Sequence, residues 1–253
     1  METEMMKVYA KTIEDTCKEQ LEQFMKSEAS VGAKVRIMPD THAGKGCVIG
    51  FTMTIQDRVV PNLVGVDIGC GMLALEVEKV DPKDFIKMCK KVPVGNKVHQ
   101  KPMVDFDLSG LVTKLDDKRK EHILCSLGTL GSGNHFIELN EMSDGKMLVV
   151  IHTGSRNLGV QVCHYHQSLA GKGDLACLQG QQMEDYLNDM KITQKYAQVN
   201  RQMIKEILIQ NGLKVTSEFE TVHNYISFDD MILRKGAISC HKGEKSFNSF
   251  KYA

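Results

Sequence analysis

The chain has 253 residues, of which 42% are hydrophobic and 25% are charged, as is typical of a globular protein. This length allows one large domain or two small ones, and we expect a single domain that spans residues 1–253. No run of about 20 apolar residues is present, which excludes a membrane-spanning helix. The 32 basic and 32 acidic residues balance, so the net charge gives no reason to expect a polyanionic partner.

The cysteines and the N-terminus both favour a reducing compartment. Eight cysteines are scattered along the chain without a Cys-x-x-Cys pair, and we interpret them as reduced, mostly buried thiols. The acidic residues at the N-terminus are not followed by the apolar core of a signal peptide. We therefore expect a cytoplasmic protein.

The first third of the chain predicts one helix followed by strands. Apolar residues at helical spacing between positions 12 and 25 indicate an amphipathic helix that packs on a core. Segments rich in β-branched or alternating apolar residues, separated by Gly, Pro and Asp, then predict successive strands. These predicted strands cover residues 34–38, 47–55, 59–66 and 72–80.

The rest of the chain mixes predicted helices and strands. An Asp-Pro pair at position 81 begins a predicted helix that runs to Cys89, because proline is tolerated in a first helical turn. Residues 175–210 predict two helices with a break near Gly180 or Ile192. Further strands are predicted for residues 147–152, 219–228 and 231–239. The pattern as a whole predicts a mixed α/β (α+β) fold.

Positive charge is concentrated in one segment of the chain. Such a segment forms either a local basic groove for a phosphate backbone or a solvated helical face, and composition favours the solvated face. The residues are Lys87, Lys90, Lys91, Lys97, Lys101, Lys118, Arg119 and Lys120.

Five segments combine glycine with side chains that bind metals or transfer protons. Glycine lets a backbone turn sharply or approach a ligand closely. The segments are residues 38–46, 65–71, 128–136, 151–156 and 222–224.

The second of these segments places Asp67 and Cys70 on one glycine-flanked turn. A thiolate, a carboxylate and imidazoles suit Zn²⁺ or Mn²⁺ better than Ca²⁺, and a thiolate can bridge two ions. His135, His152 and His223 are the candidate imidazoles. The alternative is structural: Asp67 caps the turn, Cys70 is a small buried side chain, and the histidines belong to the core.

The run from Gly128 to Asn134 also has two interpretations. Several glycines allow backbone amides to surround a phosphate, but a tight hairpin explains them equally well. The run fits neither the P-loop pattern nor a dinucleotide-binding turn.

Taken together and in this order, the five segments resemble the signature blocks of the RtcB family. These RNA ligases join ends bearing a 2′,3′-cyclic phosphate or 3′-phosphate to ends bearing a 5′-hydroxyl, in tRNA splicing or RNA repair. The resemblance runs from Met38 to Ser239. It implies the RtcB-like fold, with two Mn²⁺ ions and GTP as cofactors. The implied metal ligands are Asp67, Cys70, His135, His152 and His223.

The resemblance also implies how a nucleotide and RNA are used. It places GTP contacts at Asn134, Glu138 and Asn224, and a supporting role near the nucleophile at Asp40. In the implied mechanism a histidine takes GMP from GTP, passes it to the RNA 3′-phosphate, and the 5′-hydroxyl then displaces it. An activating protein partner is left open, and no membrane partner is expected.

The chain departs from the family pattern after Glu244, where the His-Gly-x-Gly-Arg block with the nucleophilic histidine is missing. We therefore expect a fold that is incomplete at its C-terminal end, with exposed strand edges or apolar side chains such as Ile232, Leu233 and Ile238. Two alternatives to a ligase follow. One is a non-catalytic metal- or nucleotide-binding remnant of the same fold, and the other is a metal-dependent phosphoesterase that needs no protein nucleophile.

Overall fold

A sheet of eight strands runs through the part of the chain that the computed structural model describes, residues 5–239. Its order is β1-β2-β3-β10-β9-β5-β7-β6, and all neighbours are antiparallel except β1 and β2. The strands are β1 (Met6–Val8), β2 (Val35–His42), β3 (Ile49–Thr54), β5 (Cys70–Val77), β6 (Phe136–Glu141), β7 (Met147–Thr153), β9 (Val215–Ser227) and β10 (Ile232–Lys235). Two short strands, β4 (Arg58–Val59) and β8 (Leu178–Gln179), pair separately.

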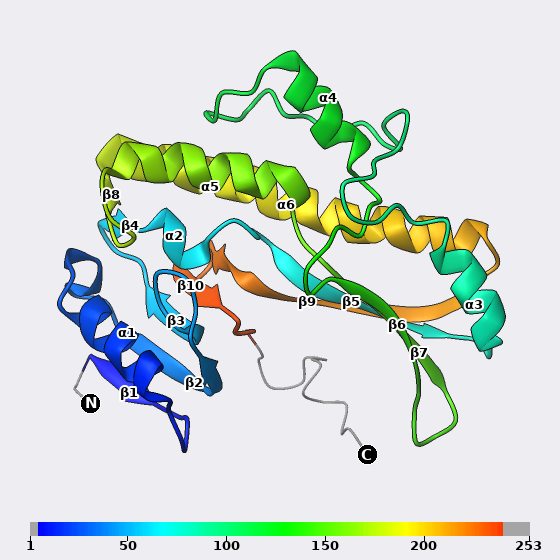
Figure 1. Cartoon of the computed structure of the whole chain (residues 1–253), viewed down its shortest axis with the longest axis horizontal. Helices are drawn as coiled ribbons and strands as arrows, with labels where there is room; N and C mark the ends of the chain where they lie inside the picture. The colour runs from blue at the N-terminus through cyan, green and yellow to red at the C-terminus, as the bar shows by residue number, and fades with distance from the viewer. Residues whose placement is uncertain (1–4, 240–253) are drawn as a thin grey trace.

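Helices α5 and α6 lie side by side along the sheet, whereas α1 packs at the end that contains β1, β2 and β3 (Figure 1). The helices are α1 (Asp15–Met25), α2 (Pro61–Val64), α3 (Pro82–Cys89), α4 (Asp117–Cys125), α5 (Arg156–Ala170) and α6 (Gly180–Gln210), with a 3-10 turn at Glu28–Ser30. The expected mixed α/β class is confirmed.

Helix packing distinguishes the two faces of the sheet. Leu73 and Leu75 of β5 pack in one buried cluster with Ile204 of α6. Because side chains alternate along a strand, the intervening Ala74 points to the other face, where it belongs to a separate, smaller cluster. His152 lies directly opposite Met72 of β5, which packs on that smaller cluster.

Several predicted elements agree with the structure. The helix predicted from position 82 to Cys89 is α3, and the Asp81 carboxylate caps it by accepting a hydrogen bond from the Lys83 amide at 2.8 Å. The strand predicted at 147–152 is β7 with one further residue. Both elements have a strong local signal, either a cap or a continuous apolar run.

The prediction of two helices in residues 175–210 was wrong in one respect. A single helix of 31 residues, α6, begins at Gly180 and continues through Ile192, while the residues just before it form β8. A β-branched residue costs well under about 1 kcal/mol in a helix. Met190 and Tyr196, on either side of Ile192 in α6, are both buried, and their burial outweighs the helix cost of Ile192.

The predicted strand at 59–66 was also wrong over most of its length. Only Val59 belongs to a strand, and Pro61 opens the short helix α2 at its first position, where its missing N-H is not needed. Helices α4 and α5 and strand β6 were not predicted, since their apolar positions are interrupted by polar residues that gain partners only in the folded molecule.

The expected exposure of the last strands is contradicted within residues 5–239. Strand β9 pairs with β10 and β5, and β10 pairs with β3 and β9, so both lie inside the sheet. Leu233 is fully buried, and Ile232 and Ile238 are half-buried. The neighbour of β10 is β3, which comes about 180 residues earlier in the chain, and a pattern of nearby residues does not predict such a long-range pairing.

The basic residues are exposed and are divided between α3, α4 and the connection between these two helices. Lys87 pairs with Asp84 on α3, and Arg119 and Lys120 pair with acidic residues at the start of α4. These exposed pairs agree with the interpretation as solvated helical faces. In the described residues, no helix combines the length and apolar character needed to cross a membrane.

Candidate metal centre

The turn between α2 and β5 presents Asp67 and Cys70 on the same side. It is closed by a hydrogen bond from the Cys70 amide to the Asp67 carbonyl at 3.3 Å. Gly69 adopts a φ of 71°, and a side chain there would meet Ala197 of α6 at 2.9 Å. Only glycine therefore combines this backbone conformation with such close packing on α6.

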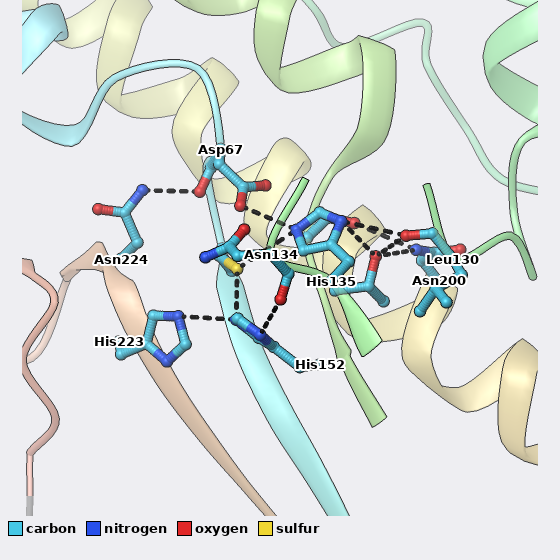
Figure 2. Close-up of polar contacts among 12 residues, drawn as sticks. Asp67, Leu130, Asn134, His135, His152, Asn200, His223 and Asn224 are labelled. Carbon is cyan, nitrogen blue, oxygen red and sulfur yellow. Dashed lines mark hydrogen bonds and ion pairs between the residues drawn. The ribbon is translucent and has the colours of Figure 1, made fainter. Parts of the chain in front are cut away.

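Three histidines converge on this turn: His152 of β7, His223 of β9, and His135, which immediately precedes β6 (Figure 2). The Cys70 Sγ lies 3.2 Å from His152 Nε2 and 3.7 Å from His135 Nε2. His135 Nε2 lies 3.1 Å from Asp67 Oδ2, and His152 Nε2 lies 3.3 Å from His223 Nε2. The five predicted ligands are therefore brought together.

The five side chains form two groups of three potential ligands that share Cys70. The first group, here called the inner triad, is Cys70, His152 and His223, and the second, the outer triad, is Asp67, Cys70 and His135. Within each group the ligand atoms lie within 4.8 Å of one another. Two atoms bound to one tetrahedral ion at ~2.0–2.3 Å are separated by roughly 3.3–3.8 Å, close to the spacings found here.

Backbone carbonyls orient two of the imidazoles. His135 Nδ1 donates to the Leu130 carbonyl at 3.1 Å, and His152 Nδ1 donates to the Asn134 carbonyl at 3.1 Å. With the proton held on Nδ1, His152 Nε2 keeps a lone pair that faces Cys70, whereas His135 Nε2 lies beside both Cys70 and the Asp67 carboxylate. This arrangement is the one that metal-binding histidines usually adopt.

The environment favours the neutral forms of His152 and His223 and the protonated form of the Cys70 thiol. Burial, together with the neighbouring His152, lowers the pKa of His223 to about 4, and burial also lowers the pKa of His152. Burial and the nearby Asp67 carboxylate raise the pKa of the Cys70 thiol. Burial disfavours ionisation of Asp67, but the neighbouring His135, Cys70 and His152 together outweigh it and lower the pKa of that carboxyl. A cation at the inner triad would meet the neutral imidazoles of His152 and His223 and would have to displace the thiol proton.

The three expected nucleotide contacts lie around this cluster in different ways. Asn224 donates from its side-chain amide to the carbonyls of Val64 and Asp67, at 2.9 and 2.7 Å, and so holds the turn that carries Asp67 and Cys70. Asn134 precedes the ligand His135 and is exposed. Glu138 is exposed on β6, two residues beyond Phe136, whose ring packs against His152 at 5.0 Å. Alternation along β6 places Glu138 and Phe136 on one face.

Asp40 is apart from the cluster. It is an exposed residue of β2, and strands β3 and β10 separate β2 from the His223-bearing strand β9. Asp40 was expected to support the nucleophile, but it does not contact the candidate metal ligands.

The backbone amides at the start of the glycine run, residues 128–130, donate hydrogen bonds within the protein. The amides of Gly128 and Thr129 donate to the Asn200 side-chain oxygen at 2.8 and 3.1 Å, and the Leu130 amide donates to the Pro93 carbonyl. Only the later part of the run, residues 132–134, lies beside His135 with its amides outside this internal network. The amides of the first part of the run are therefore not free to surround a phosphate.

Two residues of α6 near the cluster, Asn200 and Arg201, were not singled out from the sequence, although both are fully buried. Their spacing from apolar residues of the same helix could have indicated that they are buried. Asn200 lies four residues from the apolar Tyr196 and Ile204, on the face of the helix that must be buried. A polar residue on such a stripe requires a buried partner.

A mixed sheet with a buried cysteine shared by two triads defines an α/β protein with a candidate two-cation centre. A family model described as "tRNA-splicing ligase RtcB" matches residues 20–107 and 109–253. The chain therefore belongs to the RtcB family, as its resemblance predicted.

Relatives in bacteria and archaea carry the same description. RNA-splicing ligase RtcB of Escherichia coli strain K12 is 27% identical over 266 residues, which cover 83% of this chain and 65% of that protein. RNA-splicing ligase RtcB of Mycobacterium tuberculosis is 29% identical over 242 residues, 67% of this chain and 56% of that protein. tRNA-splicing ligase RtcB of Thermococcus kodakarensis is 27% identical over 238 residues, 66% of this chain and 49% of that protein. The chain spans less than two thirds of the length of these relatives.

Proposed function

We propose that this protein acts in the RNA-joining reaction of the RtcB family, and that its described residues form the metal and nucleotide centre of that reaction. The observation that carries the proposal is the shared position of Cys70 between the inner and outer triads. One thiolate between two sets of ligands suits a pair of divalent cations, for which Mn²⁺ is our candidate.

The donor set fits this assignment. Asp67, Cys70 and His135 would hold one ion, and Cys70, His152 and His223 would hold the other. Bound in this way, two divalent cations supply charge neutralisation for phosphate oxygens and alignment of the reacting groups. The chain itself supplies the orientation, because the Nδ1 protons of His135 and His152 are committed to backbone carbonyls.

We propose GTP as the nucleotide, with contacts from Asn134, Glu138 and Asn224, and RNA ends bearing a 3′-phosphate or 2′,3′-cyclic phosphate and a 5′-hydroxyl as substrates. Asn134 and Asn224 support this proposal because each is adjacent in the chain to a histidine of the cluster. A guanylylated histidine and an RNA-GMP intermediate belong to the same proposal, and none of the three cluster histidines is assigned as the nucleophile. The cytoplasm is the proposed location, and the chain is proposed to act as one domain.

One experiment separates this function from its two rivals. The purified chain is incubated with Mn²⁺, GTP labelled at the α-phosphate, and RNA fragments that carry the two kinds of end. Joined RNA, or GMP on a histidine, would support the ligase. Phosphate release from GTP or from the RNA end would instead assign a phosphoesterase. Bound Mn²⁺ and GTP with neither product would assign a non-catalytic binding protein.

A double substitution shows whether any activity depends on the centre. His152→Ala with His223→Ala removes two of the three inner ligands, and a product that persists would arise elsewhere. His164→Ala is the matched control, because His164 is an exposed histidine of α5.

A further inference from the structure

We propose that Asn200 and Arg201 are positioning residues of the metal centre, each of which sets the geometry of one triad. The inference rests on the proposed two-cation centre and adds residues on α6 that provide no metal ligand. Neither side chain is exposed to solvent.

Arg201 connects the three strands that carry the inner triad. Its Nη1 donates to the carbonyl of Gly69 at 2.8 Å and to that of Thr153 at 2.7 Å. Gly69 immediately precedes Cys70, and Thr153 immediately follows His152. The Nε atom donates to Glu220 at 2.6 Å, and Glu220 lies on β9 three residues before His223. One guanidinium therefore fixes the backbone beside Cys70 and His152 and the strand of His223.

Asn200 acts on the segment that orients His135 of the outer triad. Its Oδ1 accepts hydrogen bonds from the Gly128 and Thr129 amides, and its Nδ2 donates to the Thr129 carbonyl at 3.1 Å and the Gly154 carbonyl at 3.2 Å. The next residue in that segment, Leu130, provides the carbonyl that accepts from His135 Nδ1 (Figure 2). The Thr153 hydroxyl also donates to this carbonyl at 2.8 Å and lies 3.4 Å from Asn200 Nδ2.

Energetics favour a positioning role over simple packing. A largely buried ion pair such as Arg201 with the partly exposed Glu220 is often no more stabilising than apolar side chains of the same volume. Apolar residues at these positions would fill the space but would leave the carbonyls beside Cys70 and His152 without donors. Arg201 donates to both carbonyls from one nitrogen, Nη1, and to Glu220 from Nε, so the planar guanidinium fixes the two carbonyls relative to that carboxylate, which a flexible lysine cannot reproduce.

The test measures metal binding directly. The whole chain is titrated with Co²⁺, and each site is followed by its absorption, including the band of a cobalt-bound thiolate. Arg201→Met should weaken binding at the inner triad about 10- to 100-fold and alter the thiolate band, as loss of groups that orient metal ligands commonly does. Arg201→Lys should restore little of this affinity, and Asn200→Ala should mainly weaken the outer triad.

Matched controls come from residues with similar chemistry away from the ligands. Arg234→Met removes another buried arginine, which lies on β10 and pairs with Asp230 in the turn between β9 and β10. Asn188→Ala removes another side-chain amide of α6, which donates to Gly110. Both controls should bind Co²⁺ as the unmodified chain does.

Glu220→Gln provides a milder variant if Arg201→Met does not fold, because it keeps an oxygen for Nε while it removes the charge and the second oxygen, which accepts from Gln198. It should weaken the inner triad several-fold with an unchanged circular dichroism spectrum. Folded Arg201 and Glu220 variants with unchanged affinity and unchanged bands would overturn the inference while leaving the metal centre intact. Absence of Co²⁺ binding by the unmodified chain would instead overturn the proposed function.

Discussion

Cys70 is the residue on which the candidate centre depends most. It is the only member of both triads, and its side chain is almost completely buried. The other free cysteines of the described residues contribute to packing, as expected from their scattered positions. The difference between Cys70 and a structural cysteine such as Cys163 lies in the three imidazoles and one carboxylate that surround its sulfur.

Replacing the shared sulfur should impair both sites together. We expect Cys70→Ser to lower the affinity for Co²⁺ or Zn²⁺ at least tenfold and to abolish the thiolate absorption band, because a hydroxyl is a far weaker ligand for these ions. Cys163→Ser is the control, since Cys163 is buried but lies outside the cluster. Equal Co²⁺ spectra for Cys70→Ser and the unmodified chain would show that the sulfur is not a ligand.

The buried histidines should make the metal-free protein sensitive to mild acid. In the unfolded chain a histidine titrates near 6.5, whereas the pKa of His223 in the folded protein is about 4. Between these values the unfolded state binds more protons, so stability must fall as the pH is lowered through this window and then level off. The loss from His223 is on the order of 3 kcal/mol.

Urea unfolding at several pH values measures this effect. His223→Gln should show a shallower loss of stability between about pH 6.5 and 4 than the unmodified chain, because glutamine does not titrate. Parallel pH profiles for the two proteins would mean that the pKa of His223 is the same in the folded and unfolded states.

At the scale of elements, α6 organises the molecule. Its 31 residues contact the sheet, α5 and the connection between α3 and α4. Besides Asn200 and Arg201 it carries Asp189, which is fully buried. The Asp189 carboxylate accepts from the amides of Val112 and Thr113, and from His166 Nε2 of α5 at 2.9 Å. One carboxylate thus joins two helices and a loop.

Loss of this carboxylate should destabilise the fold strongly. Asp189→Ala leaves at least three buried donors without an acceptor, and we expect a loss of about 3–5 kcal/mol in the free energy of unfolding. Urea or thermal unfolding measures it. Glu184→Ala, at an exposed position of the same helix, should change stability by less than about 0.5 kcal/mol. A small effect of Asp189→Ala would mean that water or a rearranged loop satisfies the donors.

At the scale of the whole molecule, one sheet joins the early and late parts of the chain. Strand β10 inserts between β3 and β9, and the largest hydrophobic cluster contains residues of α1, β2, β3, α5 and α6. The candidate centre lies in the same sheet, on strands β5, β6, β7 and β9 and the turns that adjoin them.

This continuity predicts cooperative unfolding, as the proposed single domain requires. Far-ultraviolet circular dichroism and near-ultraviolet tyrosine signals should report one transition with the same midpoint, because no group of strands can separate without breaking the shared sheet. Two resolved transitions would indicate two independently folding units.

The features that the sequence by itself determined are those that depend on nearby residues or on motifs. The helix beginning at Pro82 has its own cap, β7 is a continuous apolar run, and the family motifs identified the five residues that converge. These features depend on neighbours in the chain or on residue types that metal chemistry requires.

Only the tertiary structure decided the remaining features. The insertion of β10 between β3 and β9, the continuity of α6 through Ile192, and the burial of Asn200 and Arg201 all depend on residues far away in sequence. Hydrogen bonds to Gly69, Thr153 and Glu220 make a buried arginine tolerable, and no local pattern encodes them. The physical reason is that burial and buried hydrogen bonds are satisfied between distant segments, whereas caps and periodicity are satisfied within one segment.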